Sequence, residues 1–194
     1  MIFNLKADLC GFKDLERFVM IDMKTVTKGE EAKQLFQAGY NCAQSVLGCF
    51  YEELGLSQET ALLLVSPLGG GMCRMREVCG AVSAMLIILG LADGYLPVSD
   101  KETHTKEKTR VYQTGQELAK DFREKFGSVL CSDLLAEEGN DRCAIPSERT
   151  QSYYKKRPCS DYVAYAAERI NTYLREKNIK SENYPDFQEE INVK

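Results

Sequence analysis

The chain has 194 residues, of which 44% are hydrophobic and 28% charged, a size and composition typical of one globular domain. Its net charge is −4, and its basic residues are not gathered in one region, so nucleic-acid binding is not expected. The longest apolar stretch, residues 81–92, is shorter than the roughly 20 residues that span a bilayer. It therefore predicts a buried helix and no membrane span.

The first ten residues contain no long apolar run, because Lys6 and Asp8 interrupt it. A secretory signal peptide is therefore not expected, and the predicted location is cytoplasmic. Thiols stay reduced in that compartment. The eight cysteines of the chain then favour redox chemistry or metal binding over static disulfides.

Helices are predicted along nearly the whole chain, and no segment shows the sustained alternation of a strand. An N-terminal extension (1–22) and a peripheral tail (178–194) flank a cysteine-rich domain at 23–177. The expected helices cover residues 27–36, 42–54, 58–66, 78–91, 99–126, 131–136 and 158–177, and residues 137–156 are expected to be irregular. The fold class is therefore all-α, a single-domain bundle of about six to seven helices with one long charged helix.

The helix starts carry capping residues. Thr27 with Glu30 and Ser99 with Glu102 fit capping boxes, and Asn41 is a suitable N-cap for the helix that follows it. The long helix at 99–126 has a partial apolar stripe. That stripe is expected to pack on the bundle, with a homodimer as the alternative; its residues are Val111, Leu118, Phe122 and Phe126.

Cys42 and Cys79 have the most unusual local sequences. Cys42 follows the Asn41 cap, so the unpaired amides and dipole of its helix would favour a thiolate. Cys79 begins a predicted helix after the glycine triplet at 69–71. Arg74 and Arg76 would further stabilise a thiolate at Cys79 if their side chains point inward. The alternative is that both cysteines are unreactive buried thiols.

The remaining cysteines fall into two groups. Cys131 and Cys159 each begin a predicted helix, as Cys42 and Cys79 do. Cys49 lies about 10 Å along the helix axis from Cys42, too far for a disulfide, and is expected to be a small buried residue. Cys143 is expected to be accessible, and Cys10 to be incidental.

The glycine triplet is not a phosphate-binding loop, because no Lys-Ser or Lys-Thr follows it and no strand precedes it. Gly70 and Gly71 are expected instead to let the backbone pass close to another helix or to a sulfur-bound group.

A zinc finger is disfavoured, because the chain has no Cys-x-x-Cys pair and His104, its one histidine, is expected on a solvated helix face. Four cysteines from four helix starts could still hold zinc or an iron–sulfur cluster. The sequence identifies no cofactor.

Several segments, taken in order, resemble the C_GCAxxG_C_C family, whose members are thought to be redox-active. The resemblance covers about residues 29–174 and rests on Gly39-Tyr40-Asn41-Cys42-Ala43-Gln44-Ser45-Val46, on Gly69-Gly70-Gly71-Met72, on Cys79-Gly80-Ala81-Val82-Ser83-Ala84, and on the later Cys131 and Cys159. It implies that the characteristic cysteines are Cys42, Cys79, Cys131 and Cys159, and it brings no defined substrate.

The chain departs from the family pattern at two positions. Ala84 stands where the pattern has glycine, so the helix contacts there would be slightly wider. Cys73 replaces a small residue. It could act as a local resolving partner for Cys79, or it could be a neutral replacement.

Three hypotheses about function follow. The first is a thiol-based redox protein, and so an oxidoreductase, in which Cys42 and Cys79 form the reactive pair and Cys131 and Cys159 the second or resolving pair. Its partner would be a redox protein or a small oxidised substrate. The second is a metal- or cluster-binding electron carrier that uses the same four cysteines. The third is a non-catalytic helical interaction module whose cysteines are merely buried.

Overall fold

The computed structural model describes residues 26–136 and 141–179. The predicted extension at 1–22 and nearly all of the predicted tail lie outside these residues. The all-α prediction is confirmed, since the described ranges contain helices and one isolated β-bridge but no strand. The elements are α1 (Lys28–Gln37), α2 (Cys42–Leu47), α3 (Gln58–Val65), η2 (Ser66–Leu68), α4 (Gly80–Asp93), α5 (Lys101–Phe126), α6 (Cys131–Leu134), α7 (Gln151–Lys156) and α8 (Cys159–Glu176).

Side-chain caps begin several helices where the sequence predicts them. Thr27 and Glu30 form the expected capping box of α1. The Asn41 side chain accepts hydrogen bonds from the Ala43 and Gln44 amides at the start of α2. These caps fix where each helix begins, and therefore where Cys42 lies in the fold.

Besides the helix expected at 78–91, which covers Gly80–Asp93, the expected boundaries were wrong at four places. The helix after Asn41 ends at Leu47 instead of about residue 54, and turns closed by i to i−3 hydrogen bonds follow it. The cap of α5 is Asp100 rather than Ser99, since the Asp100 carboxylate accepts from the Thr103 amide. The helix that begins at Cys131 ends at Leu134, two residues early.

The fourth error is α7, which lies inside the segment that we expected to be irregular. Its N-cap is Thr150, whose hydroxyl accepts a hydrogen bond from the Tyr153 amide. Little in the sequence indicated this helix, because it is six residues long and none of its residues is buried.

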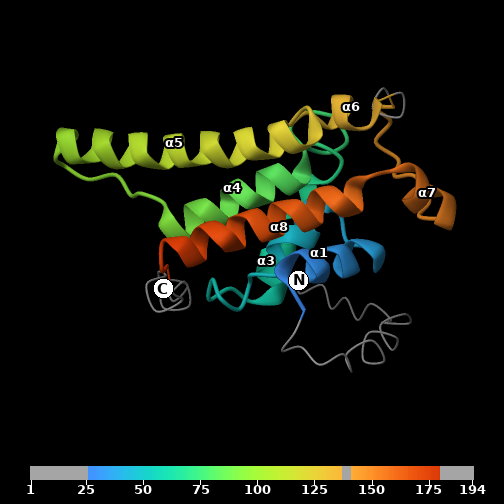
Figure 1. Cartoon of the computed structure of the whole chain (residues 1–194), viewed down its shortest axis with the longest axis horizontal. Coiled ribbons are helices and arrows are strands. Elements are labelled where there is room, and N and C mark those ends of the chain that lie inside the picture. Colours follow the sequence, from blue (N-terminus) through green and yellow to red (C-terminus); the bar gives the residue numbers. More distant parts are fainter. Residues whose placement is uncertain (1–25, 137–140, 180–194) are drawn as a thin grey trace, which may run out of the picture.

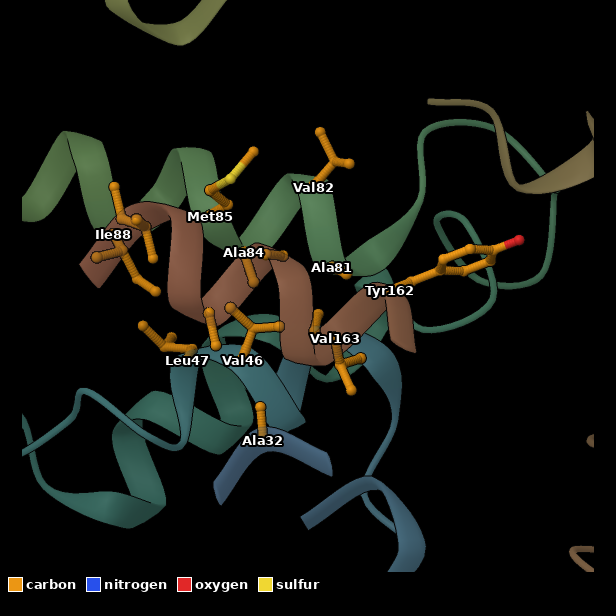
Figure 2. Packing of buried hydrophobic residues seen from close by; sticks show 14 of the residues in the cluster. Ala32, Val46, Leu47, Ala81, Val82, Ala84, Met85, Ile88, Tyr162 and Val163 are labelled. Carbon is orange, nitrogen blue, oxygen red and sulfur yellow. The ribbon is translucent and has the colours of Figure 1, made fainter. Parts of the chain in front are cut away.

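The core lies where α1, α2 and α4 pack on α8 (Figure 1). Small residues allow close contact between α4 and α8, and Figure 2 shows Ala81 and Ala84 of α4 and Val163 of α8 within one cluster of buried hydrophobic residues. All three side chains are fully buried. This packing holds the N-terminal ends of α4 and α8 on the same side of the bundle.

The long helix α5 lies along α4 and α8 (Figure 1). Leu118 and Phe122 of its apolar stripe are buried, and Val111 and Phe126 pack against the core. The Arg169 guanidinium donates to the Asp121 carboxylate at 2.6 Å and so joins α8 to α5. The stripe thus packs on the bundle. No helix in the described ranges is long and apolar enough to cross a bilayer.

A short antiparallel bridge joins two loops at the end of the bundle where α4 begins. Val78 pairs with Leu130 across this bridge. The Cys79 amide donates to the Val129 carbonyl at 2.8 Å, and the Cys131 amide donates to the Glu77 carbonyl at 2.7 Å. The bridge therefore holds Cys79 and Cys131 on neighbouring segments.

Candidate functional site

One pocket at this end of the bundle is lined by four sulfurs. Each comes from the beginning of a different helix: Cys42 is the first residue of α2, Cys131 of α6 and Cys159 of α8, and Cys79 is the N-cap of α4. The other lining residues are Gly71, Gly80, Leu134, Leu135 and Tyr162. These are the four cysteines predicted from the sequence, and the fold brings all four together.

The pocket is small and closed. Its cavity measures about 10 Å³, which is room for about one water molecule. Cys79, Cys131 and Cys159 are 4%, 7% and 6% exposed, whereas Cys42 is only partly buried.

Two glycines let backbone approach the sulfurs. Gly71 has a φ of +71°, and a Cβ built there would lie 2.6 Å from the Cβ of Cys131. A Cβ on Gly80 would lie 2.7 Å from the Leu68 carbonyl oxygen and 3.3 Å from the Cβ of Cys42. A side chain at either position would push apart the segments that line the pocket.

Cys42 is the sulfur whose surroundings favour a thiolate. Its pKa is lowered, chiefly by a hydrogen bond from the Cys159 thiol, while burial acts in the opposite direction. The positive charge of Arg149 and the backbone amides of Cys42 and Gly70 lower it further. The negative charge of the site is therefore expected on Cys42.

The other three sulfurs are expected to stay protonated. Burial and the charge of Cys42 raise the pKa of Cys79. The pKa of Cys159 is raised well above its ordinary value, chiefly because its thiol donates to Cys42. Burial also raises the pKa of Cys131. One negative charge shared among four neighbouring thiols is the expected outcome when like charges repel at short range.

Arg74 and Arg76 point to different places. Arg74 donates to the Asp141 carboxylate at 2.7 Å and to the Cys143 carbonyl at 2.5 Å, away from the pocket. Arg76 points inward, and its Nη1 lies 3.9 Å from the Sγ of Cys131. The inward arginine therefore contacts Cys131, whereas the sequence had placed it beside Cys79.

Three residues of the site were not predicted from the sequence. Tyr162 lies one helical turn after Cys159, and its hydroxyl donates to the Leu134 carbonyl at 3.0 Å. The helical spacing from Cys159 could have revealed it. Arg149 and Arg157 act electrostatically on Cys42 and Cys131. They lie in or next to the segment expected to be irregular, which gave no signal of their positions.

The remaining cysteines lie apart from the pocket lining. Cys49 is buried and donates to the Ser45 carbonyl at 3.1 Å, and burial raises its pKa. Cys73 and Cys143 are exposed. Cys10 lies outside the described residues.

All seven cysteines of the described ranges are free thiols. Among these residues, no group of three or more His, Cys, Asp or Glu side chains is arranged to hold a metal ion. His104 is partly buried beside Tyr95, with 5.5 Å between ring centroids, and is therefore less solvated than expected.

Comparison with known proteins agrees with the cysteine pattern. The model of the family described as "Putative redox-active protein (C_GCAxxG_C_C)" matches residues 40–173. The chain belongs to this family. The match begins two residues before Cys42 and ends within α8, so it includes all four sulfurs of the pocket. Comparisons with curated proteins and with solved structures found no match.

Proposed function

We propose that this member of the C_GCAxxG_C_C family is a thiol–disulfide oxidoreductase in which Cys42 is the nucleophile and Cys159 the resolving residue. The support for this is that Cys42 and Cys159 line the same pocket, and that the pKa of Cys42 is lowered chiefly by its interaction with the Cys159 side chain. A donor in that position stabilises the attacking thiolate and is also the sulfur best placed to attack next.

The reaction has two steps. The Cys42 thiolate attacks one sulfur of a substrate disulfide, forms a mixed disulfide, and releases the other sulfur as a thiolate. Cys159 then loses its proton to solvent or to the released thiolate and attacks the Cys42 sulfur. The second substrate thiolate leaves, so one substrate disulfide is reduced to two thiols while Cys42 and Cys159 are oxidised.

The pair of cysteines that reacts first in this proposal, Cys42 with Cys159, differs from the pair favoured by the sequence, which was Cys42 with Cys79. The pKa of Cys79 is raised, and the charge of Cys42 is one of the causes. The charge of Cys42 raises the pKa of Cys159 as well, so the choice of Cys159 depends on its side-chain interaction with Cys42, which lowers the pKa of Cys42.

The small cavity limits the substrate. Because there is room for only about one water molecule, a disulfide reaches Cys42 only if neighbouring loops move. We therefore propose that the physiological partner is a redox protein or a small disulfide, encountered in the cytoplasm, where thiols are kept reduced.

Alkylation at graded pH, with each site identified by mass spectrometry, tests this function. Cys42 should react in the folded protein at a lower pH than the ordinary cysteine pKa of about 8.5. Cys79 and Cys159 should react only at higher pH or on unfolding. If Cys42 behaves like them, a reactive thiol function is contradicted.

A zinc or iron–sulfur site is the second candidate, because four sulfur donors line the pocket, but in the described residues these sulfurs would have to move closer together to hold a metal. Its binding would require that all the ligating cysteines lose their protons. Anaerobic purification, metal analysis and a visible spectrum distinguish the two. Stoichiometric metal with four protected thiols would support the second candidate, and a colourless, metal-free protein would exclude it.

A further inference from the structure

Arg76 is buried deep in the protein beside one sulfur of the pocket. The residue is 2% exposed, and its Nε donates to the Asp141 carbonyl at 2.7 Å. Its Nη1 lies 3.9 Å from the Sγ of Cys131. Its Nη2 is buried without a hydrogen-bond partner among the described residues. The guanidinium thus has unused capacity to bind an anion.

The nearby carboxylate does not contact this guanidinium directly. The Asp141 carboxylate accepts from Arg74 at 2.7 Å and acts on Arg76 through its charge alone, whereas the Nε of Arg76 donates to the neutral Asp141 carbonyl. A buried charge that has neutral partners is costly unless an anion comes close. The side-chain atom that Arg76 contacts in the pocket and that can become an anion is the sulfur of Cys131.

The charge on Cys42 opposes ionisation of Cys131. It is one of the causes that raise the pKa of Cys131, together with burial, whereas Arg76 and Arg157 act to lower it. When Cys42 enters a disulfide, its negative charge is lost. Burial then remains against Cys131, but the opposing charge is gone and both arginines remain.

We propose that Cys131 is a second reactive thiol of the pocket, held by Arg76, that becomes nucleophilic only after Cys42 has been oxidised, and that Cys79 resolves it. This inference rests on the proposed function, because it assumes that Cys42 and Cys159 react first. It would let one protein molecule accept two disulfide equivalents in a fixed order.

The bridge between Val78 and Leu130 suits Cys79 for the resolving step. Cys79 and Cys131 are diagonal neighbours across this bridge, and both line the pocket. Diagonal neighbours on one face of a ladder are about 7–8 Å apart. That lies just beyond the upper end of the Cα separations found in disulfides, so a small shift of the two loops would let the sulfurs join.

The second reaction repeats the first with other residues. The Cys131 thiolate attacks a second molecule of substrate disulfide and releases one thiolate. Cys79 loses its proton to that thiolate or to solvent, attacks the Cys131 sulfur, and the second substrate thiolate leaves. In total, two substrate disulfides become four thiols, and four protein thiols become two disulfides.

Timed oxidation by excess oxidised glutathione tests the order. The protein carries Cys73→Ser and Cys143→Ser, which remove two exposed thiols, and Cys10→Ser, which removes the cysteine outside the described residues. Peptide mapping of quenched samples should show a Cys42–Cys159 disulfide first and a Cys79–Cys131 disulfide later. Blocking the first step with Cys42→Ala removes the opposing charge, so Cys131 should then react faster with glutathione than in the parent.

Arg76 is tested against its neighbour. Arg76→Gln should slow the formation of the Cys79–Cys131 disulfide by about tenfold or more, as expected for the loss of a hydrogen bond to a charged group. The rate at which the Cys42–Cys159 disulfide forms should not change. The matched control Arg74→Gln removes a contact to the same Asp141 but none to sulfur, so neither phase should change. Arg76→Lys keeps the charge and should retain part of the second phase, which covers the case that Arg76→Gln does not fold.

The outcomes separate the two proposals. A Cys42–Cys159 disulfide that is never followed by a second one overturns the role of Cys131 and leaves the proposed function standing. The same holds if Arg76→Gln and Arg74→Gln have equal effects. If no Cys42–Cys159 disulfide forms at all, the proposed function fails and this inference fails with it.

Discussion

Cys42 and Cys159 begin α2 and α8 and line the same pocket, where the Cys159 side chain is the main cause that lowers the pKa of Cys42. The two are 117 positions apart in the chain. Each arrives there because its own helix begins at that point, and because α2 and α8 pack against each other.

Removing the donor should weaken the acidity of Cys42. In Cys159→Ala the thiol that stabilises the thiolate is gone, so the pKa of Cys42 should rise. The rate of Cys42 alkylation against pH measures this. Cys49→Ala is the control, because the Cys49 thiol is buried and close to Cys42 in the chain but does not line the pocket. It should leave the pH profile of Cys42 alkylation unchanged. Equal shifts in both variants would contradict the pairing.

Arg149 should assist Cys42 through its charge. Its guanidinium lowers the pKa of Cys42, donates to the Phe36 carbonyl at 3.0 Å, and lies 4.8 Å from the Phe36 ring centroid. Arg149→Met should therefore raise the pKa of Cys42, with a loss of stability on the order of 1 kcal/mol from the lost contacts. Arg149→Lys keeps the charge and should restore most of the acidity. If the lysine variant behaves like the methionine variant, charge is not the cause.

Gly71→Ala should destabilise the fold at the pocket. The new Cβ would adopt a positive φ and would lie 2.6 Å from the Cβ of Cys131, so we expect a loss of about 2–4 kcal/mol. Urea unfolding gives the free energy. Gly39→Ala is the matched control, since Gly39 has a φ of +105° but no atom within 4 Å of the built Cβ. A loss no larger than in the control would show that the close approach to Cys131 does not matter.

Stability should fall at alkaline pH. Burial raises the pKa of Cys79 and of Cys49, so each favours the folded state as a neutral thiol. That contribution is complete below the unfolded cysteine pKa of about 8.5 and is lost as pH rises above it. The Tm should therefore drop above that pH, and Cys79→Ala should lessen the drop. An unchanged slope in Cys79→Ala would contradict a buried neutral thiol. The lowered pKa of Cys42 acts in the opposite sense, adding stability as pH rises toward 8.5.

Local signals made the helix starts predictable. The side chains of Thr27 and Asn41 act on amides two or three residues away, so the sequence alone indicated where α1 and α2 begin. Cys42 follows such a cap, whereas α4, α6 and α8 have no side-chain cap. Cys79, Cys131 and Cys159 were selected from the breaks that precede their helices and from the family resemblance.

The partners of those sulfurs could not be predicted in the same way. Arg76 reaches Cys131 because the chain around it takes a left-handed conformation, with φ of +65° at Arg76 itself. Arg149 acts on Cys42 from a part of the chain more than one hundred residues away. Neither depends on residue spacing, so only the packed structure distinguishes the inward Arg76 from the outward Arg74.

The most direct test of the central claim is the identity of the first disulfide. The reduced protein is treated with less than one equivalent of a disulfide oxidant, the remaining thiols are blocked in acid, and peptides are mapped by mass spectrometry. We predict a bond between Cys42 and Cys159. A first bond between Cys42 and Cys79, or one that leaves Cys42 as a free thiol, would contradict the account.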